Sequence, residues 1–317
     1  MTPEGIGEPR KGSGRGVRGP EGSGEPRRGA PVNRAASVPP EEESGAAGTG
    51  APESAGGAPM DSHLLEVHAL RKRFAGRVAV ERVDLRLEPG VFYGLVGPNG
   101  AGKTTTIRMC VGMLRPDEGA VLVDGVDLWR DPVAAKTRIG VLPDTLNLYE
   151  RLSGAEYLDF AGHMHRLPSR ELRHRRDELL AVLGLDADAH RLIAGYSQGM
   201  KKKLALAAAV IHSPRVLFLD EPFESVDPIS ARTMRDVLRR VIAGGACVVM
   251  TSHVMALVER MVERVGVIDR GRLVADGGVD QLCREHGVAD LDELFLKLVG
   301  TPPLGGTDLA WLGASSG

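Results

Sequence analysis

The chain has 317 residues, enough for two domains or for one large domain with extensions. Its formal charge of −2 gives no overall field that would attract nucleic acid or an anionic membrane, so we expect no nucleic-acid partner. The three cysteines are too sparse for a disulfide framework, which fits a reducing cytosol, and no segment has the roughly 20 apolar residues of a membrane span.

The two ends of the chain differ in composition from the part between them. The first 59 residues contain 14 Gly and 9 Pro and no aromatic residue. Such a segment cannot bury enough apolar surface to offset the entropy of ordering, so we predict disorder over residues 1–62. One hypothesis is that translation starts at Met60. The alternative is that residues 1–59 form a tethering tail, although no specific sequence feature supports this. Residues 301–317, also rich in Gly and Pro, are predicted to be a loose tail.

Strands and helices are predicted to alternate along residues 63–300. Period-two alternation and short apolar runs predict strands over 64–70, 78–87, 91–96, 119–125, 138–142, 215–220 and 246–251, and a hairpin over 265–274. Helices are predicted over 105–114, 153–165, 169–183, 201–212, 228–242, 279–286 and 290–299. This alternation implies an α/β fold with a mostly parallel sheet, in which a ligand binds at the carboxyl ends of the strands.

One glycine-rich segment between a strand and a helix fits the pattern G-x-x-x-x-G-K-[ST] at every fixed position. Its glycines allow the backbone to wrap around phosphate oxygens, and the following helix adds a positive end. Lys103 would reach the β- and γ-phosphates, and the Thr104 hydroxyl would bind Mg²⁺. We therefore predict a nucleoside triphosphate site rather than a simple turn, formed by Gly97, Pro98, Asn99, Gly100, Ala101, Gly102, Lys103 and Thr104.

Side chains at helix starts predict where several helices begin. The segment from Ser153 to Glu156 matches a capping box, and Ser197 stands where the N-cap of the next long helix should be. Asp227 followed by Pro228 is a cap with a first-turn proline. On the helix over 169–183, a basic cluster is predicted to be a solvated face: Arg170, Arg173, Arg175 and Arg176.

Three polar side chains follow predicted parallel strands, where we expect them to meet the phosphate loop. Hydrolysis of a γ-phosphate requires phosphate neutralisation, a metal ion and an oriented water molecule. Asp220 suits the metal, Glu221 suits polarising the attacking water, and His253 could donate a hydrogen bond to the γ-phosphate. The alternative for the two carboxylates is a solvated strand end, which the nearby phosphate loop makes less attractive.

From about Leu64 to Gly300 the chain resembles the ATP-binding cassette of ABC transporters. The pieces stand in the family order: the phosphate loop, a signature segment from Ser197 to Lys201, Asp220-Glu221-Pro222, a D-loop at 225–227, and His253 as the switch histidine. The resemblance implies a P-loop NTPase fold with a mostly parallel core sheet, an antiparallel β subdomain and a helical signature subdomain over about 145–212.

The resemblance also implies ATP and Mg²⁺ as cofactors, with Thr105 and Asp227 among the nucleotide-binding residues. Two cassettes would enclose two ATP molecules as a homodimer, so that Ser197 and Gly199 contact the γ-phosphate held by the other subunit. Reopening of this dimer after hydrolysis would drive an attached membrane protein.

Several positions depart from the commonest family pattern. Asp144 stands where most cassettes carry glutamine; it could hold the metal through water or serve only the turn after Pro143. Phe223 and Glu224 replace a small polar pair. Phe74 would stack on adenine, with a plain core phenylalanine as the equal alternative.

With the tyrosine before it, the signature segment reads Tyr-Ser-Gln-Gly-Met-Lys over residues 196–201, a variant that resembles the one in ABC-2-type exporters. We therefore expect a motor subunit working with a separately encoded membrane permease. The region 144–165 would be the docking surface, and the protein would lie in the cytoplasm, peripheral on the inner face of the plasma membrane. One rival is a soluble ABC ATPase acting on ribosomes or DNA, and another is a binding module without hydrolysis. The absence of a second cassette, the charge balance and intact Lys103 and Glu221 speak against them.

Overall fold

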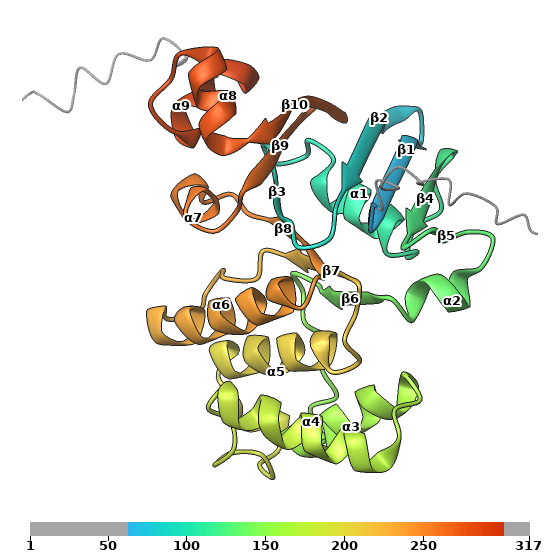
Figure 1. The fold of residues 1–317 in the computed structure, drawn as a ribbon, viewed down its shortest axis with the longest axis vertical. Coiled ribbons are helices and arrows are strands. Elements are labelled where there is room, and N and C mark those ends of the chain that lie inside the picture. Colours follow the sequence, from blue (N-terminus) through green and yellow to red (C-terminus); the bar gives the residue numbers. More distant parts are fainter. Residues whose placement is uncertain (1–62, 301–317) are drawn as a thin grey trace, which may run out of the picture. The chain divides into compact units, whose positions relative to one another are not determined.

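The computed structural model describes residues 63–300 (Figure 1). The predicted tails, 1–62 and 301–317, lie outside the described residues. The strands are β1 (Leu65–Phe74), β2 (Arg77–Leu87), β3 (Phe92–Val96), β4 (Glu118–Val123), β5 (Val126–Asp127), β6 (Ile139–Leu142), β7 (Val216–Asp220), β8 (Cys247–Thr251), β9 (Arg264–Asp269) and β10 (Arg272–Gly278).

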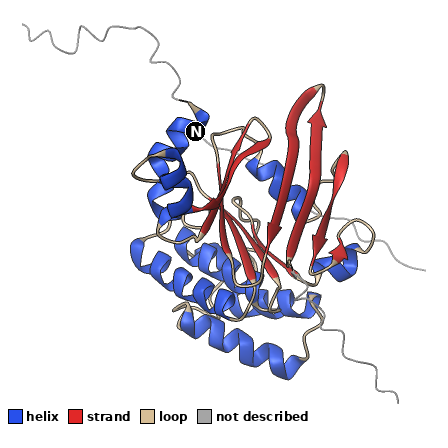
Figure 2. Cartoon of the chain, turned by 45° about the horizontal axis from the view of Figure 1, so that its top comes forward, coloured by secondary structure: helices blue, strands red, loops and turns tan. Residues whose placement is uncertain are grey.

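The strands within residues 63–300 are hydrogen-bonded in the order β5-β4-β1-β2-β10-β9-β3-β8-β7-β6. Figure 2 shows the strands in red with the helices lying beside them. The β9-β3-β8-β7-β6 half is parallel throughout, whereas β5, β4, β1 and β2 pair antiparallel. Every residue of β3, β7 and β8 is buried, as expected for strands covered on both faces. The predicted division into a parallel core and an antiparallel β part is confirmed.

The helices are α1 (Lys103–Cys110), α2 (Pro132–Lys136), α3 (Gly154–Met164), α4 (Ser169–Val182), α5 (Gln198–Val210), α6 (Pro228–Ala243), α7 (Met255–Glu259), α8 (Val279–His286) and α9 (Leu291–Val299), with a 3₁₀ turn over Ile193–Gly195. The sequence patterns missed the short helices α2 and α7. Helices α3, α4 and α5 lie against one another within the predicted helical subdomain (Figure 1).

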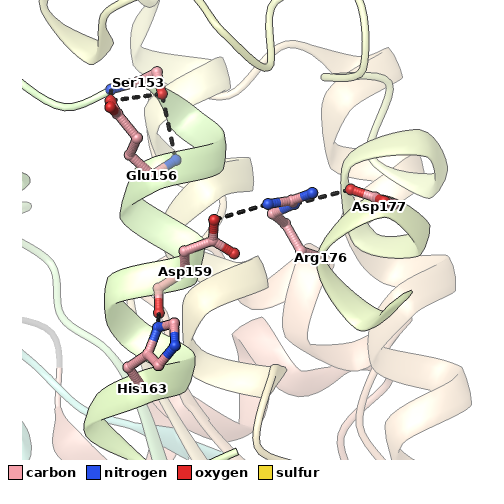
Figure 3. Close-up of polar contacts among 6 residues, drawn as sticks. All are labelled: Ser153, Glu156, Asp159, His163, Arg176 and Asp177. Atoms are coloured by element: carbon pink, nitrogen blue, oxygen red, sulfur yellow. Dashed lines mark hydrogen bonds and ion pairs between the residues drawn. The ribbon is translucent and has the colours of Figure 1, made fainter. Parts of the chain in front are cut away.

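The predicted caps form. Ser153 Oγ accepts a hydrogen bond from the Glu156 backbone N–H while Glu156 accepts one from the Ser153 backbone N–H (Figure 3). Ser197 Oγ accepts from the Met200 backbone N–H, so α5 begins at Gln198, three residues before the predicted start at Lys201. The sequence patterns missed this first turn because Gln198 is polar and Gly199 has a low helix propensity.

The basic cluster on α4 is not simply a solvated face. Arg176 Nη1 lies 2.7 Å from Asp159 Oδ2 on α3, and its Nε lies 2.9 Å from Asp177 Oδ1 (Figure 3). Arg175 donates to the Ile211 carbonyl beyond α5 and pairs with Glu171. Arg176 therefore connects α4 to α3, and Arg175 connects α4 to the end of α5. The expectation of a solvated face is wrong for these two arginines.

The core lies on both faces of the sheet, and Cys110 and Cys247 are buried in it. Burial raises the pKa of each thiol to about 12, so both stay protonated at neutral pH. On the other face, α5 packs close to β6 because Gly140 has no side chain; a Cβ there would lie 2.2 Å from the Ala209 carbonyl oxygen. Within residues 63–300, no helix is both long and apolar enough to cross a membrane.

Candidate nucleotide site

The phosphate loop connects β3 to α1, and two of its glycines are required by close contacts. A Cβ on Gly97 would lie 2.3 Å from the Ile268 carbonyl oxygen, and one on Gly102 would lie 2.7 Å from the Ala79 carbonyl oxygen. Gly102 also has φ of 111°, in the region that side-chain-bearing residues rarely adopt. The loop therefore packs closely against β9, through Ile268, and against β2, through Ala79.

Lys103 begins α1 and folds back over the loop. Its Nζ donates to the carbonyl oxygens of Gly97 at 2.6 Å and Pro98 at 3.2 Å. Burial lowers the pKa of Lys103, while the nearby carboxylates of Glu221 and Asp220 oppose this shift. The ammonium is therefore a partly desolvated cation at the centre of the loop, which favours an anionic ligand.

A cavity of about 570 Å³ opens beside this loop. It brings together segments that follow β3, β6, β7 and β8, as predicted for the carboxyl ends of parallel strands. Most of the predicted site residues line it: Pro98, Asn99, Gly100, Gly102, Lys103, Thr104, Thr105, Asp144, Asp220, Glu221 and His253.

Asp220 and Glu221 end β7 at the edge of the cavity. Asp220 is buried, and Thr251 Oγ1 on β8 donates to its Oδ1 at 2.5 Å. Glu221 has φ of 48°, an unusual value for a residue with a side chain, which directs the backbone sharply away from the strand. The two carboxylates thus leave the same strand end with different surroundings.

His253 follows β8 and meets Glu221 across the strand ends. Its Nδ1 lies 3.1 Å from Glu221 Oε2, with the imidazole half exposed and the carboxylate largely covered. Sequence separation gave no direct sign of this pairing. It follows from the parallel register of β7 and β8, in which Asp220 lies opposite Thr251.

Three predicted nucleotide residues lie away from the cavity of their own chain. Ser197 caps α5 and Asp227 caps α6, accepting hydrogen bonds from the Ile229 and Ser230 backbone N–H groups. These hydrogen bonds, chiefly the one from Ser230, lower the pKa of Asp227. A Cβ on Gly199 would lie 3.3 Å from Asp227 Oδ2, so the signature segment and the D-loop are neighbours.

Three further predicted residues do not line the cavity. Gly97 and Ala101 shape the loop from behind, Ala101 being buried. Phe74 ends β1 and is 47 % exposed, with Lys72 Nζ 5.6 Å from the centre of its ring. The interpretation of Phe74 as a core residue is therefore wrong; its role towards adenine stays a prediction.

Two residues that line the cavity were not among the predicted site residues. Glu224 adds a carboxylate to those of Asp144, Asp220 and Glu221. Its replacement of a small polar residue, already noted in the sequence, was the available signal. Ala79 comes from β2, and the alternating pattern of that strand carries no sign of a ligand.

Known proteins are similar to this chain in sequence and in fold. A family model described as "ABC transporter" matches residues 80–224. The daunorubicin resistance ATP-binding protein DrrA3 of Streptomyces coeruleorubidus is 38 % identical over 76 % of this chain and 76 % of its own length. The Nod factor export ATP-binding protein I of Ralstonia nicotianae is 34 % identical over 73 % of this chain and 72 % of its own.

A solved structure described as the ATP-binding subunit of an ABC transporter superposes with a TM-score of 0.71 and 31 % identity, covering 74 % of this chain and 99 % of that one. The chain belongs to the ATP-binding proteins of ABC transporters. Its fold and its class as a transport-coupled ATP hydrolase are as expected from the motifs, and the relationship to exporter ATPases is confirmed.

Proposed function

We propose that this chain is the ATP-hydrolysing motor subunit of an ABC-2-type exporter whose permease is a separate chain. The cassette would span residues 63–300, with 145–212 as its helical subdomain, and would lie on the inner face of the plasma membrane. Export is supported by the names of the relatives, which refer to daunorubicin resistance and Nod factor export. The observation that carries the proposal is the meeting of Lys103, Asp220, Glu221 and His253 at one cavity.

The cavity suits a magnesium–ATP complex. The close packing of Gly97 and Gly102 leaves the loop backbone free to donate to phosphate oxygens, with Lys103 as the cation. The Thr104 hydroxyl and the Asp220 carboxylate supply the oxygen donors that Mg²⁺ prefers, and Asp144 could add one through water. Mg²⁺ in this position would neutralise charge on the β- and γ-phosphates.

Hydrolysis would use the two residues that meet across the strand ends. Glu221 would accept a hydrogen bond from the attacking water and orient it towards the γ-phosphate. His253, held beside the Glu221 carboxylate, would donate its other ring N–H to a γ-phosphate oxygen. In this arrangement the histidine stabilises charge that grows during the reaction, and the glutamate places the nucleophile.

We propose a homodimer because part of the predicted nucleotide set lies outside the cavity of its own chain. Ser197 and Gly199 stand at the N-terminus of α5, where unpaired backbone N–H groups and the helix dipole attract anions. A second copy would bring these groups, with the neighbouring Asp227, to the γ-phosphate of the first. Phe74 would offer its exposed ring to adenine.

The region 144–165 offers an apolar surface for the permease. Tyr149, Phe160 and Met164 are exposed, and the Tyr149 and Phe160 rings are 5.3 Å apart, edge to face. Exposed aromatic and methionine side chains in a cluster are typical of a protein-binding surface. Asp144, at the start of this region, lines the nucleotide cavity, so the region connects the proposed docking surface to the nucleotide site along the chain.

The proposal is tested by light scattering of the full chain carrying Glu221→Gln, with and without Mg²⁺ and ATP. We expect ATP to double the mass, because the variant binds ATP but does not hydrolyse it and so cannot reopen the dimer. Glu259→Gln, an exposed carboxylate at the end of α7, is the charge-matched control and should hydrolyse ATP like the native chain. A Glu221→Gln chain that binds ATP and stays monomeric would favour a non-transport ATPase.

A further inference from the structure

Helix α5 carries a buried lysine five residues after its cap. Lys202 is 7 % exposed, and its Nζ donates a hydrogen bond to the carbonyl oxygen of Glu221 at 2.5 Å. Lysine is rarely buried to this extent without a partner, since its ammonium must give up water. Helix α5 thus has Ser197 as its N-cap, and five residues later its Lys202 ammonium contacts the backbone of Glu221.

The backbone of Glu221 is held on both sides by side chains from other elements. Its N–H donates to Thr251 Oγ1 on β8 at 3.1 Å. Its carbonyl accepts from Lys202 on α5 at 2.5 Å and from the Glu224 backbone N–H at 3.3 Å. Its φ of 48° lies in the left-handed region, where a side-chain-bearing residue persists only if its surroundings hold it. These contacts hold the Glu221 backbone in this conformation, from which the carboxylate takes its direction.

The surroundings of Lys202 explain why a charged group can be held there. Burial lowers its pKa, and the carboxylates of the cavity oppose that shift, Asp144 and Glu224 most strongly, followed by Glu221 and Asp220. The four carboxylates all line the nucleotide cavity, as Lys103 does. Lys202 does not itself line this cavity, and its ammonium meets the site through the Glu221 backbone carbonyl.

We propose that Lys202 is a positioning residue for hydrolysis, which holds the Glu221 carbonyl and so couples the direction of the Glu221 carboxylate to the signature helix α5. This inference rests on the proposed role of Glu221. Displacement of α5 by a nucleotide bound at Ser197 would be transmitted through the Lys202 side chain to the residue that orients water. Binding at one nucleotide site would in this way prepare the other for hydrolysis.

The experiment compares full chains carrying Lys202→Met, Lys202→Arg, Lys203→Met and Glu221→Gln. Each is measured for thermal unfolding, ATP affinity and the maximal rate of Mg²⁺-dependent hydrolysis. Met keeps the length of the aliphatic part without the donor, whereas Arg restores a charged donor. Lys203 neighbours Lys202 in the sequence but is only half-buried, so its variant controls for loss of one positive charge on α5.

We expect Lys202→Met to lower kcat about 10- to 100-fold while ATP affinity changes much less, because only the orientation of the water is lost. Lys202→Arg should recover most of kcat, and Lys203→Met should hydrolyse like the native chain. A merely structural lysine would instead lower the unfolding temperature without this separation of kcat from affinity. Recovery by arginine in a folded chain is the decisive observation.

The outcomes that overturn the inference differ from those that overturn the proposed function. If Glu221→Gln hydrolyses ATP at the native rate, the role of Glu221 and this inference fall together. If Glu221→Gln is inactive while Lys202→Met matches Lys203→Met, the inference alone falls. It also falls if Lys202→Met and Lys202→Arg are folded and equally slow, since the charged donor would then not be what matters.

Discussion

Nδ1 of His253 lies 3.1 Å from Oε2 of Glu221, although the two residues follow different strands, β8 and β7. The contact joins the imidazole to the carboxylate at the mouth of the nucleotide cavity. A histidine held in this way presents its other ring nitrogen in a defined direction. The pair therefore connects the residue proposed to orient water with the residue proposed to contact the γ-phosphate.

Replacing His253 with alanine should lower the maximal hydrolysis rate about 100-fold, the typical effect of removing one donor to developing charge. ATP affinity should change little, because the phosphate loop and Lys103 remain. Steady-state hydrolysis and equilibrium ATP binding measure the two effects separately. His174→Ala, at an exposed position on α4, is the matched control and should leave both the hydrolysis rate and the ATP affinity unchanged. If His253→Ala hydrolyses ATP at the native maximal rate, His253 has no role in hydrolysis.

Asp144→Ala should raise the Mg²⁺ concentration for half-maximal hydrolysis about three- to tenfold, since a water-mediated carboxylate contact to the metal would be lost. The measurement is a Mg²⁺ titration at saturating ATP. Asp186→Ala removes an exposed carboxylate remote from the cavity and serves as control. If the Mg²⁺ requirement is unchanged, Asp144 does not contact the metal through water and serves only the turn after Pro143.

Ser153→Ala should destabilise the chain by about 1 kcal/mol, because it leaves the Glu156 backbone N–H without its cap acceptor. For a cassette of this size, such a loss lowers the unfolding temperature by about 2–4 °C. Thermal unfolding followed by circular dichroism measures it. Ser169→Ala, the first residue of α4, is the control, since its side chain caps nothing there. Equal effects of the two substitutions would contradict the capping box.

How far the site could be predicted depended on the range of the interactions. The phosphate loop and the caps at Ser153 and Asp227 could be predicted because each depends on residues a few positions apart. Asp220, Glu221 and His253 could be assigned to one edge because parallel strands end together. Glu224 was seen only as a departure from a pattern, and Phe74 had two equal interpretations that exposure separates.

The sequence by itself determined the family, the order of the longer strands and helices, and the sheet edge at which the ATP site is proposed, because glycine, cap and apolar patterns act locally. Only the tertiary structure decided which side chains meet across elements. The Lys202 ammonium on α5 donates a hydrogen bond to the Glu221 carbonyl, and the Arg176 guanidinium on α4 pairs with the Asp159 carboxylate on α3. Such contacts depend on how helices pack on the sheet, and the close approach of α5 at Gly140 is an example. No local sequence pattern predicts how closely a helix approaches the sheet, because this distance results from the packing of the whole core.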